Sequence, residues 1–209
     1  MRHNFFIIPS NHLVEDAKTA VIILPEIFGH NDFIEDMAKT LTEQKIQPIF
    51  LQPLTYRFAY EEGEEAHTYF YKTFGYSFAD VFVTAIGGLK KDYQQVGLLG
   101  FSVGATLAWL ICKNMDSGAD FVIGFYGSRI RDFLHLQPCS PTLLLFAQND
   151  SFVLEPVVAR LREKPNVNLE VYPAAHGFVD HYGPNYNQVQ AEAAKKRMHE
   201  FISLMQKDL

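Results

Sequence analysis

The sequence contains only two cysteines, Cys112 and Cys139, in 209 residues. Two cysteines are too few for a disulfide framework, and they match no paired metal-ligand spacing. The eight histidines form no H-E-x-x-H motif and no facial pattern with carboxylates. We therefore expect two buried thiols in a reducing compartment, no metal site and no cofactor.

Positive charge and long apolar runs are also scarce. The 18 lysines and arginines stand against 24 aspartates and glutamates, which gives a formal net charge of -6 and no basic surface to neutralise a phosphate backbone. No apolar run approaches the roughly 18 residues of a membrane-spanning helix. The start of the chain offers only the short apolar stretch 5–8 before Pro9. We predict a cytoplasmic protein that binds neither nucleic acid nor membrane.

The length and the apolar content fit one folded domain. Domains average roughly 150 residues, so 209 residues predict a single unit spanning residues 1–209. Hydrophobic residues make up 48% of the chain, which is enough to fill one core and excludes global disorder. The expected state is a monomer or a small homo-oligomer.

Short apolar runs alternate along the chain with longer segments of helical period. The runs are β-branched or aliphatic and are bounded by Gly, Pro, Asn or Asp, which is typical of buried strands. They lie at Thr19–Leu24, Ile46–Leu51, Val96–Phe101, Phe121–Phe125, Thr142–Phe146 and Leu169–Tyr172. Residues 5–8 are a weaker candidate for an antiparallel edge strand. Strands that are apolar on both faces and alternate with helices predict the α/β class, with a mostly parallel sheet covered by helices on both sides.

Two helices have clear apolar stripes. The first stripe comprises Ile34, Met37, Ala38 and Leu41, and Asp32 is its expected N-cap, with Glu35 three residues later. The last helix is predicted at the C-terminus. Its expected core-facing residues are Val189, Ala193, Ala194, Phe201, Ile202 and Met205.

Residues 54–78 combine nine tyrosines and phenylalanines with four glutamates and have no steady period. One interpretation is structural: Phe70 and Phe74 pack as an i, i+4 pair on a helix whose glutamates face solvent. The other is functional: the aromatic residues form a cap over a substrate pocket. The sequence leaves both open.

The segment Gly100-Phe101-Ser102-Val103-Gly104 matches G-x-S-x-G and stands between a predicted strand and a predicted helix. A nucleophile on so sharp a turn leaves no room for side chains at its flanks, which explains the two glycines. The glycine spacing does not fit the G-x-G-x-x-G pattern of a dinucleotide loop. Ser102 is therefore the candidate nucleophile.

A serine hydroxyl needs a base, and the base needs a carboxylate that orients it. Asp150 follows the strand predicted at Thr142–Phe146, and His176 follows the strand predicted at Leu169–Tyr172. Both then lie at the same edge of a parallel sheet as Ser102. The chain order Ser, Asp, His is that of the α/β-hydrolase arrangement. We predict a Ser102–His176–Asp150 triad.

The backbone around the predicted site supplies candidate oxyanion donors. The Val103 N–H opens the helix that follows Ser102, and the Ile27 N–H lies after the strand predicted at Thr19–Leu24. Glu26, between Pro25 and Ile27, has two interpretations: a turn residue, or a carboxylate close to Ser102 with a raised pKa.

Four segments carry a resemblance to the dienelactone hydrolase family, a compact branch of the α/β-hydrolases. They are Leu24–Gly29, Gly100–Ala105, Phe125–Gly127, and the strand ending at Asp150 followed by Ala175–Phe178. The resemblance extends from about residue 20 to the end of the chain. It implies an eight-stranded sheet that lacks some peripheral elements, an interaction of Glu26 with the resting nucleophile, Tyr126 beside the site, and hydrolysis of small esters or lactones.

The chain departs from the family pattern at two positions. The family's best-studied members use a cysteine nucleophile where this chain has Ser102, which predicts a serine esterase that depends on His176 as base. They also place an arginine four residues after the catalytic histidine to hold a substrate carboxylate, whereas this chain has Asp180. An aspartate repels a carboxylate, so the sequence favours a small neutral ester, for example an aromatic one, that faces the Tyr and Phe residues of 54–78. Arg57 is a candidate for a remaining cation.

Two other functions fit the same motifs. A hydrolase-fold protein can bind a ligand or partner without turning it over. The same triad can also transfer the acyl group to an alcohol or thiol acceptor instead of water. The small-molecule hydrolase remains the leading hypothesis because Ser102, His176 and Gly104 are all present.

Overall fold

The computed structural model describes residues 7–8, 12–51, 54–113 and 118–208. Seven strands form one sheet in the order β1-β3-β2-β4-β5-β6-β7, in which β1 is antiparallel to β3 and the other neighbours are parallel. The strands are β1 (Ile7–Ile8), β2 (Thr19–Leu24), β3 (Ile46–Leu51), β4 (Gln95–Phe101), β5 (Phe121–Phe125), β6 (Thr142–Asn149) and β7 (Val167–Ala175). The predicted α/β class is confirmed. The described residues form seven strands where the family resemblance implied eight.

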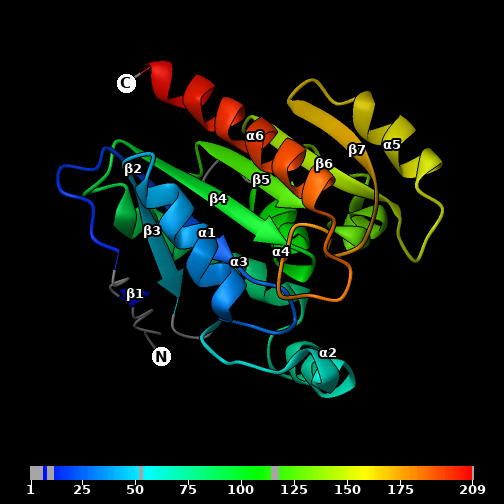
Figure 1. Ribbon diagram of the computed structural model, residues 1–209. Helices are drawn as coiled ribbons and strands as arrows, with labels where there is room; N and C mark the ends of the chain where they lie inside the picture. The colour runs from blue at the N-terminus through cyan, green and yellow to red at the C-terminus, as the bar shows by residue number, and fades with distance from the viewer. Residues whose placement is uncertain (1–6, 9–11, 52–53, 114–117, 209) are drawn as a thin grey trace.

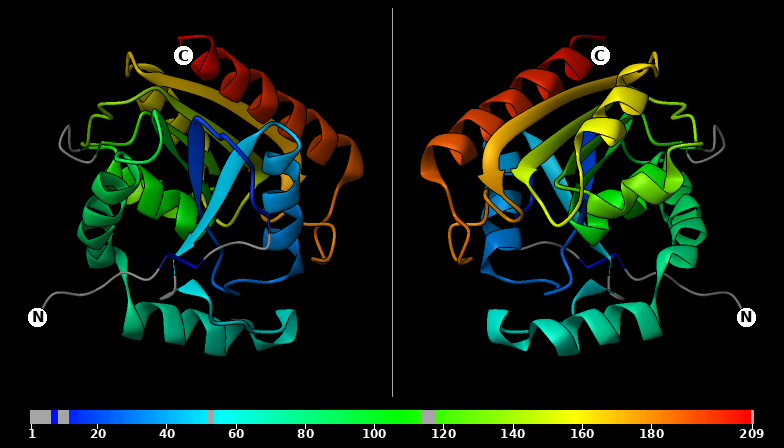
Figure 2. Two further views of the ribbon diagram at one scale, coloured as in Figure 1. Left: turned by 90° about the vertical axis from the view of Figure 1, so that its left-hand side faces the viewer. Right: turned by 90° about the vertical axis from the view of Figure 1, so that its right-hand side faces the viewer.

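Helices cover both faces of the sheet (Figures 1 and 2). The α-helices are α1 (Asp32–Thr42), α2 (Gly63–Thr73), α3 (Ala79–Leu89), α4 (Val103–Ile111), α5 (Glu155–Arg162) and α6 (Gln188–Met205). Short 3-10 helices are η2 (Tyr60–Glu62), η3 (Tyr76–Phe78), η5 (Ser128–Phe133) and η6 (Gln206–Asp208). Helices α1 and α6 pack on one face, and α3, α4 and α5 pack on the other. Helix α2 lies beyond the carboxyl ends of the strands (Figure 2).

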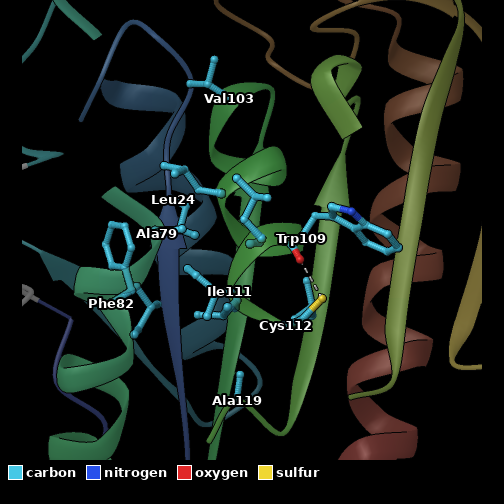
Figure 3. Close-up of a cluster of buried hydrophobic side chains, with 14 of the residues drawn as sticks. Leu24, Ala79, Phe82, Val103, Trp109, Ile111, Cys112 and Ala119 are labelled. Atoms are coloured by element: carbon cyan, nitrogen blue, oxygen red, sulfur yellow. Dashed lines mark hydrogen bonds between the residues drawn. The ribbon is translucent and has the colours of Figure 1, made fainter. Parts of the chain in front are cut away.

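The core has two layers because alternate residues of each buried strand face opposite sides of the sheet. In β2, Ile22 and Leu24 face the α3–α4 layer, whereas Val21 and Ile23 face α1 and α6. Figure 3 shows Leu24 beside side chains of α3 and α4 in the first of these layers. Every residue of α4 is buried, so this helix is held by packing along its whole length. A fixed α4 fixes the turn that precedes it.

The two helices predicted from apolar stripes are present as α1 and α6, but the N-cap of α1 and the buried face of α6 differ from the prediction. Asn31, not Asp32, is the N-cap of α1, since its side chain accepts from the Ile34 N–H at 3.1 Å. Val189 is 70% exposed and Ala193 is also exposed, so the predicted core face of α6 was wrong at these two positions. The buried face of α6 consists of Ala191, Ala194, Met198, Phe201 and Ile202.

The two cysteines differ in exposure. Cys112 is buried at the end of α4, where its Sγ donates to the Trp109 carbonyl oxygen at 3.1 Å (Figure 3). Cys139 is exposed, so the expectation of two buried thiols was wrong for this residue. The structure describes both thiols as free.

The aromatic segment 54–78 has features of both interpretations that the sequence left open. Phe70 is buried in α2, its ring lies 6.3 Å from that of Phe74, and the glutamates of the segment are exposed. The same helix also places His67 and Tyr71 against the space in front of Ser102. The segment is thus a packed aromatic cluster and one wall of a cleft. Of the possible edge strand at residues 5–8, Ile7 and Ile8 pair with β3, and the other two residues lie outside the described part of the chain.

Candidate active site

The candidate site lies at the carboxyl ends of neighbouring parallel strands. Ser102 follows β4, Asp150 follows β6 and His176 follows β7, while Glu26 and Tyr126 lie just beyond β2 and β5. Because parallel strands end at the same edge, side chains that are distant in sequence meet there. The fold therefore brings together the three residues of the predicted triad.

Ser102 lies on a strained turn that the neighbouring glycines make possible. Its φ is 52° and its ψ is -113°, a conformation that non-glycine residues rarely adopt. A Cβ at Gly100 would lie 2.4 Å from the Gly104 carbonyl oxygen, and a Cβ at Gly104 would lie 2.1 Å from the Leu24 carbonyl oxygen. The backbone segments approach so closely that only glycine fits at either flank.

Two hydrogen bonds connect the triad side chains. The Ser102 Oγ lies 2.8 Å from His176 Nε2, and His176 Nδ1 lies 2.8 Å from Asp150 Oδ2. The Asp150 side chain is only 2% exposed, and its Oδ1 accepts from the Ser151 N–H at 2.7 Å. With Nδ1–H donating to Asp150, the free lone pair of Nε2 faces the serine hydroxyl, which suits a general base.

The electrostatics of the pair favour an ionised aspartate and a basic histidine. Burial alone would raise the pKa of Asp150, but hydrogen bonds from His176 and Ser151 outweigh it and lower that pKa. Burial alone would lower the pKa of His176, but the hydrogen bond and charge of Asp150, together with the charge of Glu26, raise it above its ordinary value. The imidazole is thus a stronger base than a free histidine.

Two residues whose backbone amides have no acceptor in the described part of the chain lie at the cleft in front of Ser102. Ile27 and Val103 both line this cleft, and within the described residues neither N–H donates a hydrogen bond. The Val103 N–H belongs to the first turn of α4, where helical amides have no partner inside the helix. These two donors are where the sequence predicted the oxyanion contacts.

Glu26 contacts Tyr126 and lies close to His176. The Tyr126 hydroxyl donates to Glu26 Oε1 at 2.7 Å, and the Tyr126 ring lies 4.9 Å from the His176 ring. Burial raises the pKa of Glu26 more than the Tyr126 hydrogen bond and the charge of His176 lower it. Ser102 is hydrogen-bonded to His176 rather than to Glu26, unlike the resting contact that the family resemblance implied. Glu26 and Tyr126 thus lie beside the imidazole.

Asp180 does not line the cleft in front of Ser102. It is 2% exposed, accepts from the Tyr60 hydroxyl, and accepts from the Tyr182 N–H at 2.9 Å. It lines a separate cavity of about 160 Å³ together with Glu26 and Tyr60, which we call the rear cavity. His176 borders both spaces. A substrate in the Ser102 cleft would therefore not contact Asp180 directly.

The cleft in front of Ser102, which we call the Ser102 cleft, has a volume of about 440 Å³. Its walls also carry two arginines that no sequence motif marked, Arg129 and Arg131 of η5. Arg57, the cation that the sequence suggested, instead pairs with Asp32 at 2.7 Å and borders a different hollow. The cationic side chains at the Ser102 cleft are thus Arg129 and Arg131, and not Arg57 as the sequence suggested.

Neither a metal-ligand cluster nor a membrane-spanning helix occurs in the described parts of the chain. They contain no group of three or more His, Cys, Asp or Glu side chains arranged to hold a metal ion. No helix formed by those residues combines the length and apolarity needed to cross a bilayer.

Curated relatives match part of the chain. YczH of Bacillus subtilis, an uncharacterized protein, is 43% identical over 90 residues, which are 42% of this chain and 44% of that protein. Carboxymethylenebutenolidase 1 of Cupriavidus pinatubonensis is 27% identical over 117 residues, which are 53% of this chain and 49% of that protein. The chain therefore spans about half the length of these two relatives.

A solved structure and a family model cover much more. The crystal structure of a dienelactone hydrolase from Anabaena variabilis superimposes with a TM-score of 0.62 over 88% of each chain at 18% identity, a likeness of fold. The model of the dienelactone hydrolase family matches residues 7–206. Since this match takes in nearly the whole sequence, the chain belongs to the dienelactone hydrolase family.

Proposed function

We propose that this protein hydrolyses small carboxylic esters or lactones, with Ser102 as the nucleophile. Membership of the dienelactone hydrolase family supports a hydrolase. The observation that carries the finer proposal is the continuous hydrogen-bonded chain from Ser102 through His176 to Asp150, with 2.8 Å at each link. Its distances fall within the range for proton transfer from a nucleophile to a base.

The proposed reaction has two halves. As the Ser102 Oγ attacks the ester carbonyl carbon, its proton passes to His176 Nε2 and the carbonyl oxygen becomes an oxyanion that accepts from the Ile27 and Val103 N–H groups. The tetrahedral intermediate then expels the alcohol, which takes the proton from His176, and an acyl-serine remains. Water, deprotonated by His176, attacks the acyl carbon and releases the acid and the free serine.

A fluorophosphonate probe tests the proposal, because such probes react with activated serines far faster than with ordinary ones. We expect one adduct per chain, located at Ser102 by peptide mass spectrometry. The exposed Ser203 of α6 supplies a matched control, since Ser203→Ala should label like the wild type. Folded protein that takes up no probe would contradict the proposal and favour the ligand-binding alternative.

The pH dependence offers a second prediction. Only the neutral imidazole accepts the serine proton, so kcat/KM should fall as the pH drops through the pKa of His176. Because Asp150 and Glu26 raise this pKa above the ordinary 6.5, the midpoint of the acid limb should lie above pH 6.5. The measurement is kcat/KM for an uncharged 4-nitrophenyl ester between about pH 5 and pH 8. A rate that is constant across this range, or a midpoint below 6.5, would contradict it.

A further inference from the structure

The charged groups around the Ser102 cleft are unevenly distributed. Among its lining residues, Asp150 is the single carboxylate, and it is already engaged by His176 and Ser151. Arg129 and Arg131 supply two positive charges, and the other titratable side chains of the lining are His67, Tyr71 and His176. Glu26 and Asp180 line the rear cavity instead. A chain with a net charge of -6 thus presents a cationic wall to its candidate nucleophile.

The two arginines differ in how firmly they are held. Arg131 Nη1 donates to the Ser128 carbonyl oxygen at 2.6 Å, and its guanidinium lies 4.7 Å from the centre of the Phe152 ring. Arg129 makes one ion pair, Nη2 to Asp132 Oδ2 at 2.7 Å, and its side chain is 45% exposed. A guanidinium has five N–H donors, so Arg129 keeps donors for a further partner. Arg131 is therefore the more firmly held of the two charges.

The net charge of this wall sets the charge of a suitable partner. Asp132 pairs with Arg129 at 2.7 Å and lies 4.0 Å from the Arg131 Nε, so one carboxylate offsets two guanidiniums. The remaining single positive charge matches a monoanion better than a dianion. A planar guanidinium fork also matches a carboxylate by paired hydrogen bonds.

We propose that Arg129, backed by Arg131, forms a subsite for a carboxylate on the substrate, so that the preferred esters carry one negative charge on the acyl or the alcohol part. This subsite lies on η5, after β5. The position four residues after His176, where the family pattern has its arginine, is Asp180 in the rear cavity. The inference rests on the proposed hydrolase function and names its substrate class.

The test compares matched esters that differ in one charge. The acyl pair is 4-nitrophenyl hydrogen glutarate and its methyl ester, and the alcohol pair is 3-acetoxybenzoate and its methyl ester. For each pair the readout is the ratio of kcat/KM for the anionic ester to kcat/KM for the neutral ester. Comparing this ratio between wild type and variant cancels the intrinsic reactivity of the esters.

Arg129→Gln should lower this ratio about tenfold for at least one pair, as expected for the loss of charge-assisted hydrogen bonds to the anionic ester. Arg129→Lys should give a smaller loss. Arg160→Gln is the matched control. Like Arg129, Arg160 forms an ion pair with a carboxylate three residues later, Glu163, but it lies on the exposed side of α5 and does not line the Ser102 cleft. Raising the ionic strength from about 0.02 to 0.3 M should lower the wild-type ratio more than that of Arg129→Gln.

The outcomes separate the two proposals. If the wild type hydrolyses the neutral esters and Arg129→Gln leaves both ratios unchanged, the carboxylate subsite is refuted and the hydrolase proposal stands. If the wild type hydrolyses no member of either pair, both proposals fail together. Retained turnover of the neutral ester by Arg129→Gln shows that the variant is folded, so a lost ratio then supports the subsite.

Discussion

Ser102→Ala is expected to lower kcat/KM for 4-nitrophenyl acetate by at least about 10³-fold, because the variant has no oxygen to form the acyl-enzyme. The remaining rate would come from the Ile27 and Val103 amides and from substrate binding alone. The measurement is release of 4-nitrophenol under conditions where the wild type is linear in enzyme concentration. This loss should be the largest effect of any single substitution on activity.

The fold should not change with the Ser102→Ala substitution. Among the described residues, the Ser102 hydroxyl is hydrogen-bonded to His176, and this is the contact that the substitution removes. Alanine at a φ of 52° carries the same backbone strain as serine, so the strain does not change. The thermal unfolding midpoint should therefore stay close to that of the wild type. A variant that unfolds normally and still turns over the ester at the wild-type rate would show that the nucleophile is another group.

The strands and the triad could be predicted because a parallel sheet leaves few alternatives. Apolar runs such as Thr19–Leu24 and Phe121–Phe125 are buried on both faces, so the run itself marks the strand, and the structure gives the same bounds. Once the strands are parallel, residues after their carboxyl ends must share an edge. Ser102, Asp150 and His176 could thus be placed near one another without knowledge of any side-chain conformation.

Helix details were harder to predict because neighbouring residues offered nearly equal choices. Asn31 and Asp32 are both good capping residues, and only the backbone geometry decides that Asn31 accepts from Ile34. In α6, alanines occur on several sides of the helix and say little about its orientation. Its face is set by the larger Met198 and Phe201, whose direction continues back to Ala194 and Ala191 rather than to Ala193.

The positions of Asp180 and Arg129 around the triad were missed because they depend on contacts between distant loops. Asp180 faces the rear cavity because Tyr60, which is 120 residues away in sequence, donates to its carboxylate. Arg129 lies in a short 3-10 helix, where no apolar periodicity shows which side chains face the cleft. One signal was available: η5 follows β5, whose carboxyl end lies at the same edge as Ser102. A basic cluster directly after that strand was a candidate for the cleft wall.

Gly104→Ala is expected to destabilise the fold more than any of the other substitutions, lowering the free energy of unfolding by about 3 kcal/mol, the upper part of the usual range for overpacking. The new Cβ would lie 2.1 Å from the Leu24 carbonyl oxygen and 2.6 Å from that of Pro25. Both obstacles are backbone atoms, which cannot rotate away as a side chain would. For a chain of 209 residues this corresponds to a fall of about 10 °C in the unfolding midpoint.

The matched control for Gly104→Ala is Gly87→Ala in α3. Gly87 is exposed, and a Cβ there would meet nothing within 4 Å, so alanine should stabilise this helix by up to about 1 kcal/mol. Urea unfolding of both variants measures the opposite signs directly. The residual activity of folded Gly104→Ala should also fall, because relief of the clash must shift the segment that carries Glu26 and Ile27 away from Ser102. If Gly104→Ala were as stable and active as Gly87→Ala, the close approach of the turn after β4 to the loop after β2 would be wrong, and with it the proposed position of the Ile27 N–H.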